Sequence, residues 1–268
     1  MHTAGYRGAE LIDTHAHLGD AAFDDDRDEV LARARAAGVA AVVTVGETLA
    51  DARRSLDLAT RHPEILPTAG LYPTHLDREQ AAALERFIRE RRHELVAIGE
   101  VGLDYWKVRE EADLEIQREI FGQFVDLAQE LDLPLNVHSR SAGRHAVALL
   151  LEHGARRVQL HAFDGRPSSA MPAVEAGYFF SVPPSIARSR QKHKLVRHLP
   201  LSCLLLETDS PVLGPVLGER NEPANVRIAL ECIAKIKGVP AEEVAEATVE
   251  NTRRLYGASL GRESHESP

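Results

Sequence analysis

Eight short apolar runs, separated by longer stretches of helical periodicity, fill the chain from residue 11 to residue 256. Within each run the apolar residues follow one another instead of alternating with polar ones, which is typical of strands covered on both faces. We expect these strands at residues 11–13, 40–45, 66–70, 96–99, 135–137, 158–160, 178–182 and 204–207. The helical pattern is clearest at residues 29–38, 114–131, 147–154, 189–198, 225–237 and 240–256.

This alternation predicts an α/β fold of one domain. Eight units of strand followed by helix, within about 250 residues, favour a (β/α)₈ TIM barrel. A doubly wound open sheet is the alternative. Polar residues of chemical interest follow strands one, four, five, six and eight, and these strands share one rim only if the sheet closes. We therefore predict a barrel over residues 10–257, a flexible tail over residues 1–9 and a disordered tail over residues 258–268.

Composition and charge exclude several classes of protein. The net charge of −9 is the wrong sign for tight non-specific binding to nucleic acid. No stretch approaches the roughly 18 consecutive apolar residues of a membrane span, and no signal peptide is evident at the start. The two cysteines, Cys203 and Cys232, are far apart and fit a reducing compartment. We expect a cytoplasmic protein with no contact to membranes, and nothing in the sequence indicates an obligate protein partner.

Four histidines stand at or just beyond the ends of apolar runs. His15 and His17 are two residues apart after the first run, so both imidazoles point to the same side of a strand and can reach one ion. His138 and His161 end the fifth and sixth runs. A single histidine in such a place is usually structural, but two on neighbouring strands favour a second metal ion. Asp13 lies on the side of His15 and His17 and is expected to orient an imidazole.

Carboxylates end two further runs. Glu100 follows the fourth run between Gly99 and Gly102, and glycines let backbone and ligands approach closely, so we interpret it as a carboxylate that bridges two metals. Glu207 and Asp209 share a side after the eighth run. Asp209 is expected to be a ligand that also accepts a proton from water. Glu207 is expected one layer deeper, partnered by ligand histidines or held in an interior salt bridge.

Arginines lie in two segments that contain no acidic residue. One, between residues 133 and 151, contains Arg140 and Arg144, and the other, between residues 177 and 206, contains Arg188 and four further lysines and arginines. The segments are either solvated helix faces or a local positive rim on an acidic body that would hold a phosphate-bearing substrate. Arg220 completes the candidates for phosphate contacts.

These motifs together resemble the TatD family of metal-dependent hydrolases, described as deoxyribonucleases. The similarity extends from Leu11 to Tyr256, and further segments are similar to a branch of the family found in animals. The ordered set consists of His15-Ala16-His17, Gly99-Glu100-Val101-Gly102-Leu103-Asp104, Val137-His138-Ser139-Arg140, His161-Ala162-Phe163-Asp164-Gly165 and Glu207-Thr208-Asp209-Ser210-Pro211.

The resemblance implies a binuclear centre of two divalent ions, with Zn, Mn, Ni and Mg all compatible with histidine and carboxylate ligands. The first ion would be bound by His15, His17, Asp209 and a shared Glu100, and the second by Glu100, His138 and His161. Many family members have histidine where this chain has Tyr72, in a position thought to face the substrate. Tyr72 therefore departs from the family pattern at a position expected to contact the substrate.

The leading functional prediction is a metal-dependent hydrolase that cleaves phosphodiester bonds of DNA, from single-stranded ends, with water activated by two metals. Asp209 and Glu100 would be the catalytic residues. An amide, ester or lactone hydrolase of the wider amidohydrolase superfamily is the first alternative, since the same ions can polarise a carbonyl. A metal-binding scaffold without catalysis is the second, although that reading would normally go with a missing ligand and every ligand is present.

Overall fold

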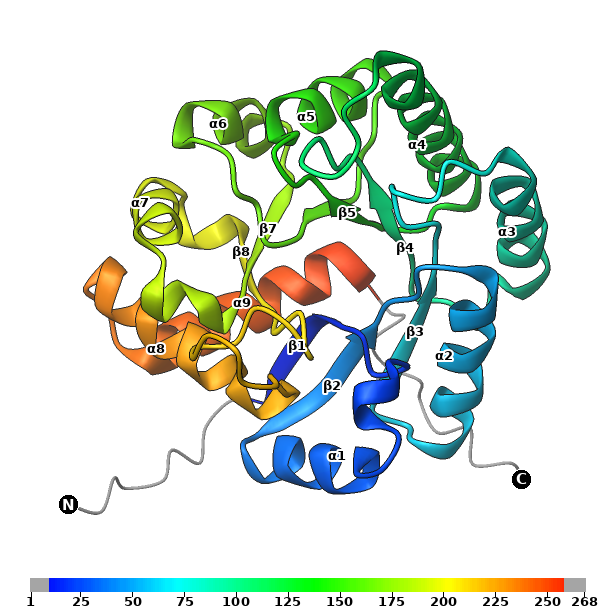
Figure 1. The fold of residues 1–268 in the computed structure, drawn as a ribbon. Coiled ribbons are helices and arrows are strands. Elements are labelled where there is room, and N and C mark those ends of the chain that lie inside the picture. The colour runs from blue at the N-terminus through cyan, green and yellow to red at the C-terminus, as the bar shows by residue number, and fades with distance from the viewer. Residues whose placement is uncertain (1–9, 258–268) are drawn as a thin grey trace.

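The computed structural model describes residues 10–257, in which eight parallel strands pair in chain order, each with the next (Figure 1). The two predicted tails, residues 1–9 and 258–268, lie outside the described residues. The strands are β1 Leu11–Ala16, β2 Val39–Thr44, β3 Ile65–Ala69, β4 Ala97–Gly102, β5 Leu135–His138, β6 Val158–Leu160, β7 Phe179–Val182 and β8 Leu204–Leu206.

Helices surround the strands on the outside of the ring (Figure 1). They are α1 Arg27–Ala36, α2 Leu49–Arg61, α3 Arg78–Arg91, α4 Glu111–Leu131, α5 Gly143–Glu152, α6 Pro167–Glu175, α7 Arg190–His198, α8 Val226–Lys237 and α9 Ala241–Tyr256. Strands and helices alternate as the sequence indicates, and the predicted (β/α)₈ barrel is confirmed.

The ring closes between the last strand and the first. The backbone N–H of Asp209 donates to the carbonyl of His15 over 2.8 Å, and the hydroxyl of Thr14 donates to the carbonyl of Leu206, also over 2.8 Å. These contacts exclude the open-sheet alternative. They also bring residues from the two ends of the chain to the same rim.

Local sequence explains where several helices begin and end. The side chains of Thr48, Asp77 and Ser189 accept backbone N–H groups in the first turns of α2, α3 and α7. Helix α8 ends at Gly238, which has a φ of 70° in the left-handed region where a side chain is strained. The starts of α2, α3 and α7 end the loops that follow β2, β3 and β7 at the rim, whereas Gly238 ends α8 just before α9.

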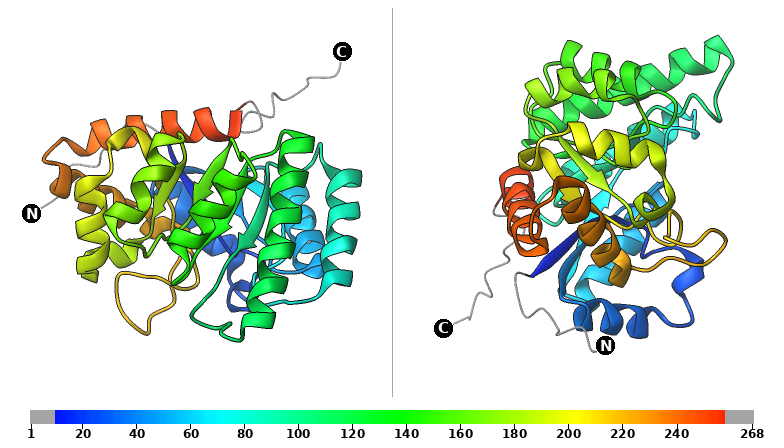
Figure 2. Two further views of the ribbon diagram at one scale, coloured as in Figure 1. Left: turned by 90° about the horizontal axis from the view of Figure 1, so that it is seen from above. Right: turned by 90° about the vertical axis from the view of Figure 1, so that its left-hand side faces the viewer.

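Helix α9 covers the end of the barrel opposite to the long loop of residues 212–222 (Figure 2). Its last residues, Leu255 and Tyr256, are buried in an apolar layer with Val43, Leu205 and Phe179. One end of the barrel is therefore closed by packed side chains, and polar side chains occupy the other. None of the helices within residues 10–257 is long and apolar enough to cross a membrane.

Candidate metal centre

Four polar atoms from three strand ends face one another at the open rim. The Nε2 atoms of His15 and His17 lie 3.7 Å and 3.5 Å from Glu100 Oε2, and 3.5 Å and 3.3 Å from Asp209 Oδ1. Ligands held about 2.1 Å from a tetrahedral ion are separated by about 3.4 Å. The spacing of these atoms is therefore that of a ligand shell.

Two of the four atoms, His15 Nε2 and Glu100 Oε2, are buried and have no hydrogen-bond partner among the described residues. A buried polar atom without a partner is costly, and native structures contain few of them. A cation placed among the four atoms would satisfy both at once. The residues present thus fit a divalent metal ion.

A second set of atoms meets at the other oxygen of Glu100. Glu100 Oε1 lies 2.6 Å from His138 Nδ1 and 2.9 Å from His161 Nε2, and the two nitrogens are 3.0 Å apart. Gly102 permits this approach, because a Cβ there would lie 2.0 Å from the backbone oxygen of His138. Glu100 consequently spans both sets with one oxygen in each, the arrangement expected of a bridging carboxylate.

The pKa values of the histidines in the cluster are set by burial and by the charged groups that surround them. Burial by itself would lower the pKa of His15, but Asp209 and Glu100 raise it to about 10. The pKa of His138 is raised to about 9 by Asp104 and Glu100 against the same effect of burial. Burial, together with neighbouring His15, lowers the pKa of His161 to about 4. Divalent ligation would displace the protons that these imidazoles hold.

Asn136 is a member of the site that was not predicted from the sequence. It lies on β5, is fully buried, and its Oδ1 is 2.8 Å from Nδ1 of His15. This hydrogen bond fixes the ring so that Nε2 faces Glu100 and Asp209. The signal was present in the sequence, since Asn136 is two residues before His138 and therefore on the same side of the strand.

The two carboxylates expected to support the ligands lie close to them but bond mainly to other groups. Asp13 accepts the backbone N–H groups of His15 and Thr208 and bonds to no imidazole within residues 10–257, and burial raises its pKa to about 7. Glu207 accepts the backbone N–H of Ala162 and the hydroxyl of Ser181, and its Oε2 is 3.8 Å from Nδ1 of His161. Burial raises the pKa of Glu207 to about 8.

A cavity of about 520 Å³ opens onto the cluster. Tyr72 lines it with its hydroxyl 3.4 Å from Asp104 Oδ2, and burial together with Glu100 and Asp104 raises the tyrosine pKa, so that the hydroxyl stays protonated. Lys192 also lines it and donates to the carbonyl of Ala162. Four further lining residues were not predicted as site residues, although Lys192 belongs to the second segment without acidic residues and Asp164 to one of the motifs; the four are Glu47, Lys107, Asp164 and Lys192.

Of the four arginines considered for phosphate contacts, Arg140 alone lines this cavity. Arg144 is exposed on α5. Arg220 pairs with Asp26 on the surface, with N–O distances of 2.6 Å and 2.8 Å, and does not reach the cluster. Arg188 is exposed and donates to the carbonyl of Gly214.

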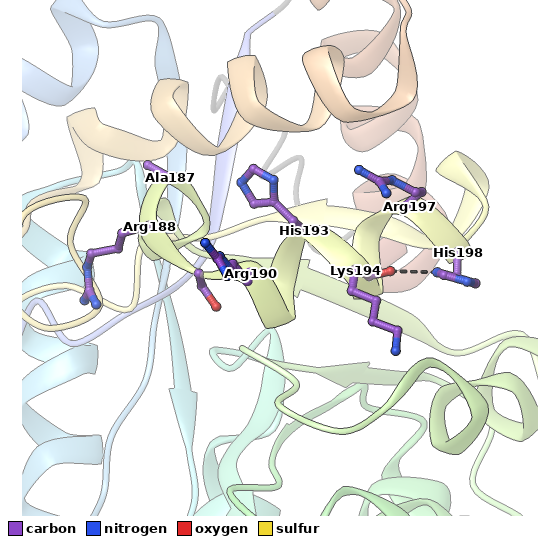
Figure 3. A pocket seen from close by; sticks show the side chains of 8 residues that line it. Ala187, Arg188, Arg190, His193, Lys194, Arg197 and His198 are labelled. Carbon is purple, nitrogen blue, oxygen red and sulfur yellow. Dashed lines mark hydrogen bonds between the residues drawn. The ribbon is translucent and has the colours of Figure 1, made fainter.

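Arg188 instead belongs to a positively charged groove of about 550 Å³ along α7 (Figure 3). We call this groove the basic face of α7. Its lysine and arginine residues make no ion pair with any residue from 10 to 257, in contrast to Arg220. It is lined by Ala187, Arg188, Ser189, Arg190, His193, Lys194, Arg197 and His198.

A (β/α)₈ barrel with histidines and carboxylates gathered at its open rim is the architecture of metal-dependent hydrolases. A family model described as TatD related DNase matches residues 12–257. The chain belongs to the TatD family, and the resemblance found in its motifs is confirmed.

The chain is also similar to individual members of the family from animals and from a bacterium. The chain is 47% identical over 261 residues to the putative deoxyribonuclease TATDN3 of Mus musculus, covering 93% of this chain and 89% of the relative. It is 45% identical to deoxyribonuclease TATDN3 of Homo sapiens, with 93% and 95% covered. The crystal structure of YJJV, a TatD homologue from Escherichia coli, superposes with a TM-score of 0.85 at 29% identity, covering 92% and 98% of the two chains. These matches include the animal branch expected from the sequence.

Proposed function

We propose that this protein hydrolyses phosphodiester bonds of DNA, from single-stranded ends, with two divalent metal ions. The observation that carries the proposal is Glu100, whose two oxygens each face a separate set of buried nitrogen and oxygen atoms beside an open cavity. Deoxyribonuclease is the name given to the mouse and human relatives, and it supports DNA as the substrate.

The ligand assignment follows the two sets of atoms. His15, His17 and Asp209 would bind one ion, His138 and His161 the other, and Glu100 both. Bound divalent ions would neutralise charge on the phosphate and lower the pKa of the attacking water. Zn, Mn, Ni and Mg are all compatible with these ligands.

Residues of the chain itself would hold the substrate and accept a proton from the attacking water. Although burial would raise the pKa of Asp209, His15 and His17 hold it well below its usual range, so the carboxylate is ionised, as a metal ligand must be. Asp209 would also accept the proton of the attacking water, because its carboxylate faces the open cavity. Arg140 offers a charged donor to phosphate oxygens, and the protonated Tyr72 a neutral one. Tyr72 would thus replace the substrate contact of the histidine found in many family members.

Cleavage of single-stranded DNA, labelled separately at its 3′ and 5′ ends, tests the proposal. The reactions contain chelator, Mg²⁺, Mn²⁺ or Zn²⁺, and compare the native chain with Asp209→Asn and with a surface control of the same chemistry, Asp126→Asn. We expect metal-dependent shortening that only Asp209→Asn abolishes. Metal-loaded protein that cleaves carbonyl esters or amides but no nucleic acid would overturn the assignment.

We also assign the protein to the cytoplasm. Its cysteines, the buried Cys203 and the half-buried Cys232, are both unpaired, which fits a reducing compartment. Fractionation of cells that express a tagged full-length chain tests this, and recovery in a secreted or membrane fraction would contradict it.

A further inference from the structure

Trp106, the only tryptophan of the chain, follows Asp104 by two residues and is 50% exposed. It is in the loop between β4 and α4, where its backbone N–H donates to Asp104 Oδ1 over 2.9 Å. The other oxygen of Asp104 is 3.3 Å from His138 Nε2. The same carboxylate thus contacts both the tryptophan loop and a residue of the cluster, so this loop adjoins the cluster.

Arg140 covers one side of this indole. Its Cζ atom lies 3.8 Å from the ring centroid, well within the distance of a cation–π contact. Arg140 lines the cavity, and its carbonyl accepts the backbone N–H of Tyr105 over 3.0 Å, which ties the two loops together. No acidic side chain among residues 10–257 pairs with this guanidinium. Two flat groups, one aromatic and one charged, are therefore stacked at the mouth of the cavity and are free to contact a ligand.

Nucleobases are the ligands that such a surface suits best. Bases that are not stacked in a helix pack on aromatic rings and on guanidinium planes, and every base has a face that can do so. A base inside a duplex is already stacked on both sides, so the surface would select unpaired bases. Stacking also matters more here than in a basic protein, because a chain of net charge −9 gains little from long-range attraction to phosphates.

We propose that Trp106 and Arg140 form a platform on which an unpaired nucleobase stacks while a neighbouring phosphate lies at the metal centre. This inference rests on the proposed function, and it gives that function a physical basis for preferring single-stranded ends. Trp106 would bind substrate without taking part in the bond-breaking step.

The binding test compares two labelled single strands of equal length, an oligothymidylate and an abasic oligomer with the same sugar–phosphate backbone. Binding is measured by fluorescence anisotropy in chelator, so that no turnover occurs. We expect the oligothymidylate to bind about 5- to 150-fold more tightly, the range that corresponds to stacking of one base, and to quench the emission of Trp106. Trp106→Ala should remove the difference, and Trp106→Phe should retain part of it.

Leu217→Ala is the matched control, because Leu217 is 81% exposed in another loop and its truncation also removes exposed apolar surface. It should leave both affinities unchanged. Equal binding of the two oligomers by the native chain, or an unchanged preference in Trp106→Ala, would overturn the platform.

Cleavage with added metal separates failure of the platform from failure of the proposed function. We expect the native chain to cut both oligomers, and Trp106→Ala to raise KM for the oligothymidylate by the factor seen in binding, with kcat unchanged. If the native chain cuts neither oligomer, the proposed function fails. If it cuts both with one KM, which Trp106→Ala does not alter, the proposed function stands and the platform is refuted.

Discussion

Replacing Asn136 by alanine tests whether the orientation of His15 depends on one buried amide. The change removes the acceptor that faces His15 Nδ1 over 2.8 Å. The other partners of Asn136 keep a hydrogen bond, since the carbonyl of Thr14 is still 3.2 Å from Gln159 Nε2 and the hydroxyl of Tyr256 still donates to Gln159 Oε1. The free energy of unfolding should therefore fall by the cost of one unpaired buried nitrogen, about 1–3 kcal/mol.

The effect on metal binding should be larger than a general loss of stability would cause. Removing the group that orients a ligand histidine typically weakens metal affinity about 10- to 100-fold, which corresponds to about 1.4–2.7 kcal/mol. Competition with a coloured chelator measures affinity for Zn²⁺ and Mn²⁺, and thermal unfolding measures stability.

Asn251→Ala supplies the control for this experiment. Asn251 is also a buried asparagine, and it donates to the carbonyls of Leu201 and Leu204 away from the cluster. Its replacement should destabilise the fold to a similar extent and leave metal affinity unchanged. If the Asn136 and Asn251 variants lose the same stability and bind metal equally well, the orienting role of Asn136 is refuted.

Three further outcomes are expected. Because the pKa values of His15 and His138 are raised in the folded chain, to about 10 and about 9, chelated protein should be most stable below the ordinary histidine pKa of 6.5. It should lose that stability progressively as the pH rises from 6.5 through 9 to 10, whereas metal-loaded protein should not. Thermal unfolding measured from pH 6 to pH 10 tests this. Charge reversal of three residues on the basic face of α7 should make the affinity for single-stranded DNA less sensitive to salt, lowering the slope of log affinity against log salt concentration by about 2. Reversal of three other exposed arginines should leave this slope unchanged. The test set is Arg190, Lys194 and Arg197, and the control set is Arg53, Arg86 and Arg253. Arg220→Ala should leave kcat/KM unchanged, because Arg220 pairs with Asp26 outside the cavity; a loss above tenfold would contradict this placement.

The sequence predicts the barrel well because its strands are covered on both faces and therefore appear as continuous apolar runs. The run at residues 158–160 coincides with β6, whereas β1 continues three residues beyond its predicted end into the polar residues Thr14 and His15. Polarity conceals that part of the strand, since the rim of the barrel is polar inside. Helix α6 gives little periodic signal, because it has nine residues and Pro172 in its interior.

The six side chains predicted as ligands lie together because their strands end at one rim of a closed sheet. The topology of the barrel alone ensures this. Their roles in binding ions stay a prediction. Side chains farther from a strand end are less predictable. Arg220 and Arg140 look alike in the sequence, but Asp26 lies beside the first and an indole beside the second. Such partners come from distant parts of the chain and leave no local pattern.

Closure of the barrel between its first and last strands, with α9 covering one end, has a consequence for synthesis of the protein. His15 leaves the ribosome early, whereas Asp209 follows β8, and Tyr256, whose hydroxyl is 3.3 Å from the amide of Asn136, comes from the end of α9. A growing chain therefore holds only part of the cluster until the segment after β8 has been synthesised. Ion capture, and the nuclease activity proposed to depend on it, would begin only once β8 has joined the barrel and brought Asp209 to the rim.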